Sequence, residues 1–194
     1  MALEQTPEDT DGQSGRLLNG LDHVAVITGD TERLIAFYAE VFDATVRYQV
    51  PGPGGGRISI LQIGPATALN IYEIPGNSEA RRQAPMFGRG RLDHLGLRAA
   101  SRETFDLIRD RLIARDASDG FVTDFGPTLS LFFRDPDGLE AEVCVPNPAG
   151  RPDVHNPPGT PAPGYQPGVP SLSTTDGAGA AGAAGAAGAA GAAG

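Results

Sequence analysis

The chain has 194 residues and a formal net charge of −9, and all fifteen of its cationic side chains are arginine. The excess of acidic side chains disfavours a nucleic-acid partner, because phosphate binding depends on clustered cations. The lack of lysine excludes a Schiff-base lysine, a pyridoxal-phosphate anchor and a Walker-type phosphate loop. A single cysteine, Cys144, rules out an intrachain disulfide, and since no run approaches the roughly 20 apolar residues of a membrane span, we expect a cytoplasmic protein without a membrane partner.

Both ends of the chain differ in composition from its middle. Residues 1–19 are polar, with four acidic side chains and one arginine, while residues 147–194 are dominated by Pro, Gly, Ala, Ser and Thr and close on Gly-Ala-Ala triplets. Small side chains cannot offset the entropy of ordering a backbone. The composition therefore predicts a disordered N-terminal extension, a disordered tail, and a single domain over residues 20–146. His155 falls within the tail, so we assign it no role.

The first part of the domain, residues 20–75, reads as a strand, a helix and three more strands. Residues 21–27 alternate in polarity and are rich in β-branched side chains, which is typical of a strand with one buried face. Asp30 can cap a helix that ends at Phe42, since the apolar residues between them recur at helical spacing. The three strands that follow are expected at residues 44–50, 57–63 and 68–74.

The second part, residues 92–146, repeats this order after a connection rich in Pro, Gly and Arg at residues 76–91. Its opening Leu-Asp-His, residues 92–94, echoes the Leu-Asp-His of residues 21–23. A helix is expected from a cap at Ser101 to about residue 114, and strands at residues 92–98, 121–125, 128–134 and 139–145. The sequence therefore predicts an internal duplication within an α+β domain.

Superposing the two copies brings candidate metal ligands together. An offset of 71 residues places His23 on His94, and an offset of 72 places Asn70 on Glu142 while keeping apolar neighbours on the opposite face. His23, His94 and Glu142 are therefore expected to converge in a cleft lined by the sheets. Two imidazoles and one carboxylate are a recurrent ligand set for catalytic Zn²⁺ or non-haem Fe²⁺.

Each of these residues also has an ordinary structural interpretation. A single His in a strand is more often a hydrogen-bonded residue than a ligand, and a Glu in a final strand is usually solvated. Glu140, two residues before Glu142 on the same face, is a rival for its role. Cys144 shares that face, but a buried thiol accounts for it. Since side chains alternate along a strand, Asp22 and Asp93 are expected to point away from the histidines that follow them.

Four segments, in their order along the chain, carry a resemblance to a known family. They are the L-D-H-x-A-V opening at residues 21–26, the helix around residues 35–38, the second L-D-H strand at residues 92–94, and the D-P-D-G-L-E-A-E ending at residues 135–142. Over residues 20–146 the chain resembles the vicinal oxygen chelate superfamily. Its members include glyoxalase I, extradiol dioxygenases, methylmalonyl-CoA epimerases and the fosfomycin and bleomycin resistance proteins.

This resemblance implies two paired βαβββ modules that form a cleft around one divalent metal ion, and a homodimer. The family's ligands fall on His23, His94 and Glu142, with Asn70 as a further candidate, and the ion could be Fe²⁺, Zn²⁺, Mn²⁺ or Ni²⁺. Two positions depart from the family. Asn70 stands where glyoxalase I-like proteins generally place Glu or Gln, and an amide is a poor proton acceptor. Phe132 stands where the extradiol dioxygenase signature has Tyr.

Two classes of function stay open. In the first, the metal chelates neighbouring oxygens of a small-molecule substrate, in a reaction of the glyoxalase, lyase, isomerase or dioxygenase type. Candidates for orienting that substrate are Tyr48, Arg57, Tyr72 and Ser130. In the second, the cleft sequesters a drug or metabolite without catalysis, as bleomycin-resistance proteins do. The complete ligand set favours the enzyme, since a pure binder does not need it. A purely structural ion is least favoured, because structural zinc sites are normally closed by four protein ligands and prefer Cys.

Overall fold

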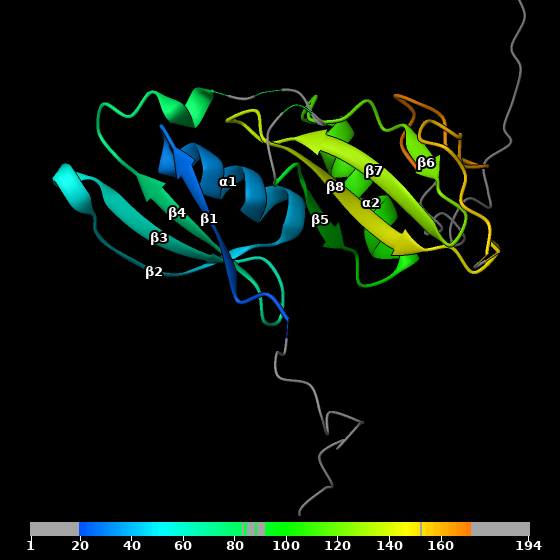
Figure 1. Ribbon diagram of the computed structural model, residues 1–194, viewed down its shortest axis with the longest axis horizontal. Helices are drawn as coiled ribbons and strands as arrows, with labels where there is room; N and C mark the ends of the chain where they lie inside the picture. Colours follow the sequence, from blue (N-terminus) through cyan, green and yellow to red (C-terminus); the bar gives the residue numbers. More distant parts are fainter. Residues whose placement is uncertain (1–19, 83, 85–87, 89–91, 152, 172–194) are drawn as a thin grey trace, which may run out of the picture.

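The computed structural model describes residues 20–82, 84, 88, 92–151 and 153–171, and within them two copies of one unit lie side by side (Figure 1). In the first copy, the Asp30 side chain accepts a hydrogen bond from the backbone N–H of Arg33 at 3.0 Å and so caps the helix, as predicted. The elements of this copy are β1 (His23–Thr28), α1 (Thr31–Phe42), β2 (Thr45–Pro51), the short 3-10 helix η1 (Pro53–Gly55), β3 (Arg57–Gln62) and β4 (Ala68–Glu73).

The second copy follows the 3-10 helix η2 (Glu79–Arg81) and has the same order of elements. Ser101 caps its helix by accepting a hydrogen bond from the backbone N–H of Thr104 at 3.2 Å. The tight turn before the last strand requires Gly138, whose φ is +87°. The elements are β5 (Leu95–Arg98), α2 (Arg102–Ile113), β6 (Val122–Asp124), β7 (Thr128–Arg134) and β8 (Glu140–Pro146).

Each copy forms a four-stranded mixed sheet in which the first strand lies beside the last. The strand orders are β1-β4-β3-β2 and β5-β8-β7-β6, with β1 parallel to β4 and β5 parallel to β8. The registers are equivalent as well, because Ala25 lies opposite Asn70 and Gly96 lies opposite Glu142. This arrangement confirms the predicted α+β fold of two paired βαβββ modules, called module one and module two from here on.

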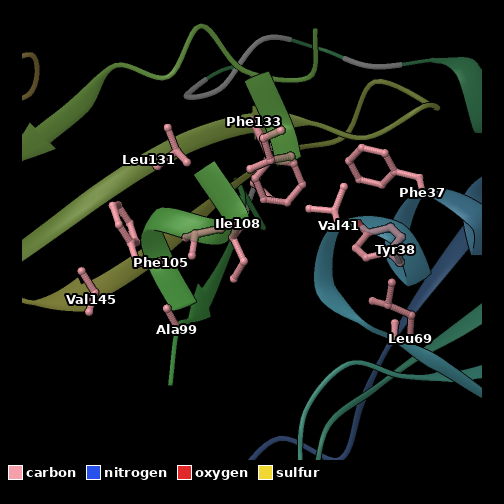
Figure 2. Close-up of a cluster of buried hydrophobic side chains, with 14 of the residues drawn as sticks. Phe37, Tyr38, Val41, Leu69, Ala99, Phe105, Ile108, Leu131, Phe133 and Val145 are labelled. Atoms are coloured by element: carbon pink, nitrogen blue, oxygen red, sulfur yellow. The ribbon is translucent and has the colours of Figure 1, made fainter. Parts of the chain in front are cut away.

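The two modules share one hydrophobic core on the helix-covered sides of their sheets (Figure 2). Along β8, buried side chains alternate with partly exposed ones, and β7 does the same except at Ser130, which is also buried, so one face of the sheet packs on α2. Phe133 of β7 reaches across to module one, where its ring centroid lies 6.2 Å from that of Phe37 and 5.4 Å from that of Phe42. Burying one such side chain stabilises the fold by about 1.5–3 kcal/mol. The core therefore joins the modules into one unit.

A polar junction at the β7–β8 turn adds to this contact. Asp137 accepts hydrogen bonds from the hydroxyl of Thr28 at 2.6 Å and from the Arg33 guanidinium at 2.5 Å, so both donors come from module one. Asp135 accepts bonds from the backbone N–H groups of Asp137 and Leu139, each at 2.9 Å. Burial raises the pKa of Asp135 to about 6. The turn predicted from sequence is therefore also the place where module two is fixed onto module one.

The chain after β8 differs from the disordered tail expected for residues 147–194. The backbone N–H of Asp124 donates to the carbonyl of Thr160 at 2.8 Å, and the N–H of Ala162 donates to the carbonyl of Val122 at 2.9 Å. The chain thereby runs beside the free edge of β6 and covers it, and Ala162 is buried in the core. We call residues 147–151 and 153–171 the C-terminal segment.

Arg109 of α2 holds the end of the C-terminal segment. Its side chain is 1% exposed, and it donates to the carbonyl of Gly120 at 2.8 Å and to the carbonyl of Gln166 at 2.6 Å. The Tyr165 ring stacks on its guanidinium, 5.1 Å from the ring centroid. A third hydrogen bond goes to the Ser171 hydroxyl at 3.2 Å. Composition gave no sign of this docking, because the two shorter bonds go to backbone carbonyls, which any sequence supplies.

The outer parts of the predicted disordered ends, residues 1–19 and 172–194, lie outside the described residues. Within the described ranges, no helix combines the length and the apolar character that crossing a membrane requires.

Candidate metal centre

Each sheet has an open face, the face turned away from its helix, and in module two this face carries Phe132 and Glu142 side by side. The two residues are register partners on β7 and β8. Glu142 also lies opposite Gly96 of β5, where an added Cβ would come within 3.4 Å of the Glu142 Oε1 atom. A side chain at this place would therefore lie in ordinary van der Waals contact with the carboxylate.

His94 directly precedes β5 and meets Glu142 on this open face. Its Nε2 lies 3.3 Å from the Glu142 Oε1 atom, and its Nδ1 lies 2.8 Å from the Asp93 Oδ2 atom. Hydrogen bonding to Asp93 raises the pKa of His94, and the charge of Glu142 raises it further. With Nδ1 bound to a carboxylate, Nε2 is the nitrogen directed at Glu142, which is the usual arrangement around a metal-binding imidazole.

Ser130 fixes the other oxygen of Glu142. The fully buried hydroxyl of Ser130 donates to Oε2 and leaves Oε1 facing His94. Cys144 lies beside them, with Sγ 3.9 Å from the Ser130 hydroxyl oxygen. Burial raises the pKa of the Cys144 thiol to about 11, so it is protonated at neutral pH and a poor metal ligand in the free protein. The rival Glu140 instead pairs with Arg134, whose Nε lies 2.9 Å from its Oε1.

The open face of module one carries the remaining candidates. His23 lies at the start of β1, with its Nδ1 2.8 Å from the Asp22 Oδ2 atom. Asn70 donates from Nδ2 to the hydroxyl of Tyr72 at 3.2 Å, and its Oδ1 is buried without a hydrogen-bond partner within the described ranges. Tyr48 lies on the same face and is exposed. The face therefore presents the His23 imidazole, which contacts Asp22, and the Asn70 amide oxygen, which has no hydrogen-bond partner among the described residues. At the position equivalent to Glu142 it has this amide in place of a carboxylate.

Arg57 lies on the other side of this sheet, contrary to its placement among the cleft candidates. It is the register partner of Glu73, one residue away from the pair formed by Ile58 and Tyr72. Its guanidinium pairs with Glu32 of α1 at 2.5 Å and with Glu73 at 3.1 Å. Side chains alternate along a strand, so Arg57 faces α1 and supports the helix rather than a ligand.

The expectation that Asp22 and Asp93 point away from the histidines was wrong. Each carboxylate lies 2.8 Å from the Nδ1 atom of the histidine that follows it. Asp22 precedes β1, and Asp93 and His94 both precede β5, so the alternation of strand side chains does not apply to them. The signal in the sequence was the repeated Asp-His pair itself, because a carboxylate that orients a ligating imidazole is a common partner in metal sites.

The structure brings together two of the three predicted ligands. His94 and Glu142 are in contact, whereas His23 lies on the sheet of module one and contacts Asp22. In the part of the chain that the structure describes, no group of three or more His, Cys, Asp or Glu side chains is gathered closely enough to hold a metal ion. The three-ligand set stays a prediction.

A cleft of about 880 Å³ opens in front of the His94–Glu142 pair. This volume is in the range of small-molecule sites. Its walls are apolar side chains and carboxylates, drawn from β7, β8, the loop after α2 and the C-terminal segment. The lining residues are His94, Asp116, Ala117, Ser118, Asp119, Phe125, Thr128, Phe132, Phe133, Arg134, Glu140, Glu142, Cys144 and Pro158.

The donor set formed by His94 and Glu142 fits a divalent cation. An imidazole nitrogen and a carboxylate oxygen face each other, and their other polar atoms are engaged by Asp93 and Ser130. Nitrogen and oxygen donors of this kind suit Zn²⁺, Fe²⁺, Mn²⁺ and Ni²⁺. Two protein ligands leave the coordination open, so a further ligand and substrate oxygens have places to bind.

Comparisons with known proteins agree with the fold. The sequence model of the Glyoxalase/Bleomycin resistance protein/Dioxygenase superfamily matches residues 20–143. The search of curated proteins gave no match.

Solved structures of similar fold come from several bacteria. A glyoxylase/bleomycin resistance protein/dioxygenase domain from Frankia sp. EAN1pec is 21% identical, with 68% of this chain and 94% of that chain covered and a TM-score of 0.56. A glyoxalase family protein from Enterococcus faecalis is 22% identical, with 66% and 99% covered and a TM-score of 0.52. The fosfomycin resistance protein FosX from Listeria monocytogenes, complexed with Mn(II) and sulfate, is 18% identical, with 70% and 98% covered and a TM-score of 0.49. At these identities the likeness concerns the fold alone.

Proposed function

Because the chain belongs to the Glyoxalase/Bleomycin resistance protein/Dioxygenase superfamily, we propose that it is an enzyme that uses a divalent metal ion to act on a small, oxygen-rich molecule. The observation that carries the proposal is the contact between His94 Nε2 and Glu142 Oε1 at 3.3 Å, at the floor of a cleft. The reaction belongs to the glyoxalase, lyase, isomerase or dioxygenase type.

His94 and Glu142 would hold the ion through Nε2 and Oε1. When bound, the ion supplies a Lewis acid to which two neighbouring oxygens of the substrate can bind. Asp93 keeps a proton on His94 Nδ1, so that Nε2 presents its lone pair. Ser130 holds Glu142 Oε2, which fixes the plane of the carboxylate. Phe132, beside both ligands, excludes water from one side of the site.

The third ligand in this proposal is His23 of the partner subunit. The open face of module one leaves large apolar side chains in solvent, with Tyr48 exposed at 55% and both Ile27 and Val50 at 42%. Such a surface is suited to a second copy of the chain. The buried Asn70 Oδ1, which has no hydrogen-bond partner among the described residues, would also find one there. A homodimer that places this face over the cleft would therefore complete the site.

A second candidate is a binding protein that sequesters its ligand without catalysis. It is supported by Asn70, which stands at the position equivalent to Glu142 and cannot act as a base. It is also supported by Ser130, which occupies one of the two oxygens of Glu142. Turnover separates the candidates, because an enzyme consumes a ligand that raises its melting temperature, whereas a binder returns that ligand unchanged.

Metal binding by paired variants tests the site and its third ligand. His23→Ala and His94→Ala chains carry different affinity tags, are expressed together, and the mixed dimer is purified through both tags. Wild-type protein should bind about one Mn²⁺ per chain, and each variant alone should lose most of it. In the mixed dimer one cleft has His94, Glu142 and the partner subunit's His23 intact. The mixed dimer should therefore recover half of the wild-type sites.

Three results would count against the proposal. Full metal retention by His94→Ala would contradict the proposed metal site. A wild-type protein that binds no divalent ion would contradict it as well. A mixed dimer that recovers no site would show that His23 acts within its own chain. His155→Ala is the matched control, since this exposed histidine lies in the C-terminal segment and should leave metal binding unchanged.

A further inference from the structure

The last part of the C-terminal segment, residues 157–171, forms a series of tight turns by itself. Each turn has Pro followed by Gly at its centre, and the backbone N–H after the turn donates to the carbonyl three residues earlier. These bonds join Thr160 to Pro157 at 3.2 Å, Tyr165 to Ala162 at 3.3 Å, and Val169 to Gln166 at 3.2 Å. Since Pro presets a backbone angle and each turn closes locally, the segment loses little entropy when it binds a surface. We call residues 157–171 the turn segment.

The turn segment lies beside β6 and along one face of α2 (Figure 1). Its backbone pairs with the edge of β6, and its side chains and carbonyls contact helix residues that recur three, four, seven and eight positions apart. We call the contacted part of module two the α2–β6 surface. It consists of Arg102, Phe105, Asp106, Arg109 and Asp110 of α2 and Val122, Thr123 and Asp124 of β6.

Tyr165 is the main side-chain anchor of the turn segment. Its hydroxyl accepts a hydrogen bond from Arg102 Nε at 2.5 Å and donates one to Asp106. The guanidinium carbons of Arg102 and Arg109 lie 4.9 Å and 5.1 Å from its ring centroid. The Phe105 ring meets the Tyr165 ring edge-on, with centroids 6.0 Å apart. The surface therefore recognises a phenol ring by its faces, its edge and its hydroxyl.

The rest of the turn segment contributes little to the core. Of residues 157–171, only Thr160, Ala162, Tyr165 and Ser171 are not exposed, and only Ala162 is buried. The turn segment has no charged residue, while the α2 part of the surface carries two arginines and two aspartates, so neither side presents an excess charge to the other. One methyl group, one ring and a set of hydrogen bonds therefore hold the segment, and it can leave while both modules keep their cores.

Without an occupant, the α2–β6 surface would have polar groups without partners. Arg109, which is 1% exposed, would lose its hydrogen bonds to Gln166 and Ser171. The edge of β6 would lose the backbone bonds that it now makes to Thr160 and Ala162. A buried donor without an acceptor is costly, and an open sheet edge accepts another strand. The surface therefore favours an extended chain that supplies carbonyl groups and an aromatic ring.

We propose that the α2–β6 surface is a peptide-binding site, that the chain's own turn segment is an exchangeable occupant, and that the site takes the turn segment of a second copy of this chain. The chain before the turn segment stays attached, because Asn156 Nδ2 donates to the carbonyl of Asp124 at 3.0 Å. Extended from there, residues 157–171 span up to about 50 Å, enough to reach a neighbouring molecule. This inference goes beyond the proposed function and does not depend on it, since no residue of the surface is a candidate metal ligand.

Binding of a free peptide to full-length chains tests the site. The probe is a fluorescent peptide of residues 157–171, and anisotropy measures its binding. In the wild-type chain the resident segment competes at an effective concentration of about 1 mM, so the peptide should bind weakly. The Tyr165→Ala chain holds its own segment loosely and should bind the peptide at least about 10-fold more tightly than the wild type does. Val169→Ala is the matched control, because this side chain of the same segment is 49% exposed, and it should bind as the wild type does.

The surface and the second copy are tested with a variant on α2. Adding Arg102→Ala to the Tyr165→Ala chain should weaken peptide binding several-fold, because the ring loses a donor and a cation. For the second copy, the Tyr165→Ala chain is immobilised through an N-terminal tag. It should capture a full-length Arg102→Ala chain, whose intact segment is loosely held, several-fold more than an Arg102→Ala, Tyr165→Ala chain. The two captured chains differ only in the ring, so any other contact between copies contributes equally to both.

Each contrary result overturns a stated part of the proposal. Equal peptide affinity of the wild-type and Tyr165→Ala chains, or no binding by either, would overturn the exchange. A Tyr165→Ala chain without a cooperative thermal transition would also overturn it, because the turn segment would then be part of the core. Unchanged peptide binding after Arg102→Ala would overturn the assignment of the surface. Equal capture of the two full-length chains would overturn the second copy as occupant.

Discussion

The open faces of the two modules occupy equivalent places in a duplicated fold but differ in chemistry. Asn70 and Glu142 hold the same register position, each opposite the first strand of its sheet. In module two the carboxylate contacts His94 and Ser130 and lines a cleft that Asp116 and Asp119 also line. In module one the amide bonds to Tyr72 on a face with exposed Tyr48 and Val50. Module two is therefore suited to hold an ion, and module one is suited to cover it.

This difference shows how a repeat can keep its fold while its two copies take separate roles. The buried faces of both sheets must fill one shared core, so their apolar alternation is constrained in both copies. The open faces carry no such constraint, because a polar or an apolar side chain can occupy them without opening a cavity. Residues on the open faces can therefore differ in charge between the modules, as Asn70 and Glu142 do.

The largest expected effect comes from the core that the modules share. Phe133→Ala removes a ring that contacts Phe37 and Phe42 of module one and should lower the free energy of unfolding by about 3–5 kcal/mol. Urea unfolding measures this loss. Leu107→Ala on the exposed side of α2 is the control and should change the free energy by less than about 0.5 kcal/mol. A loss below about 1 kcal/mol for Phe133→Ala would mean that the modules do not depend on this contact.

The next effect tests the equivalent register positions directly. Glu142→Ala should weaken Mn²⁺ binding more than about 100-fold, because loss of a ligand exceeds the 10- to 100-fold cost of losing an outer partner. Asn70→Ala, at the same position of module one, should weaken it by less than about 10-fold. Equilibrium dialysis with Mn²⁺ measures both. Equal losses in the two variants would show that both modules contribute a ligand from this position.

The pH dependence of stability tests the β7–β8 turn, which in module two is buried against module one. Burial raises the pKa of Asp135 to about 6 from the ordinary 3.8, so the native state binds this proton more tightly than the unfolded state. The stability from this group is complete below about pH 4 and is lost as the pH rises to about 6. Between these values the wild type should lose about 2 kcal/mol more than Asp135→Asn, as measured by urea unfolding at each pH. Parallel profiles for the two proteins would contradict the assignment.

The smallest effect compares the two Asp-His pairs. Asp93→Asn should weaken Mn²⁺ binding about 10-fold, because the carboxylate that orients His94 is replaced by a weaker acceptor. Asp22→Asn should have a similar effect only if His23 is a ligand. Calorimetric titration of both variants therefore tests whether His23 is a metal ligand while the histidine itself stays in place. An unchanged affinity in Asp93→Asn would assign that carboxylate a structural role alone.

Much of the fold could be predicted from sequence because its determinants are local. The caps at Asp30 and Ser101 and the Gly138 turn each act within a few residues, and alternation fixed which side of each strand is buried. The pairing of Asn70 with Glu142 followed from the same parity. Arg57 was placed on the wrong face because its partners Glu32 and Glu73 lie far from it in sequence.

The sequence by itself determined the duplicated order of elements and the residue types at the candidate site, since both depend on periodicity and short-range capping. Only the tertiary structure decided that Asp22 and Asp93 turn toward the histidines, that the C-terminal segment docks on Arg109, and that His23 stands apart from His94 and Glu142. These features depend on backbone direction at strand ends, on carbonyl groups that every residue carries, and on the placement of one module against the other. The repeated Asp-His pair is the one trace of these features in the sequence, and the other two leave no period or motif in the chain.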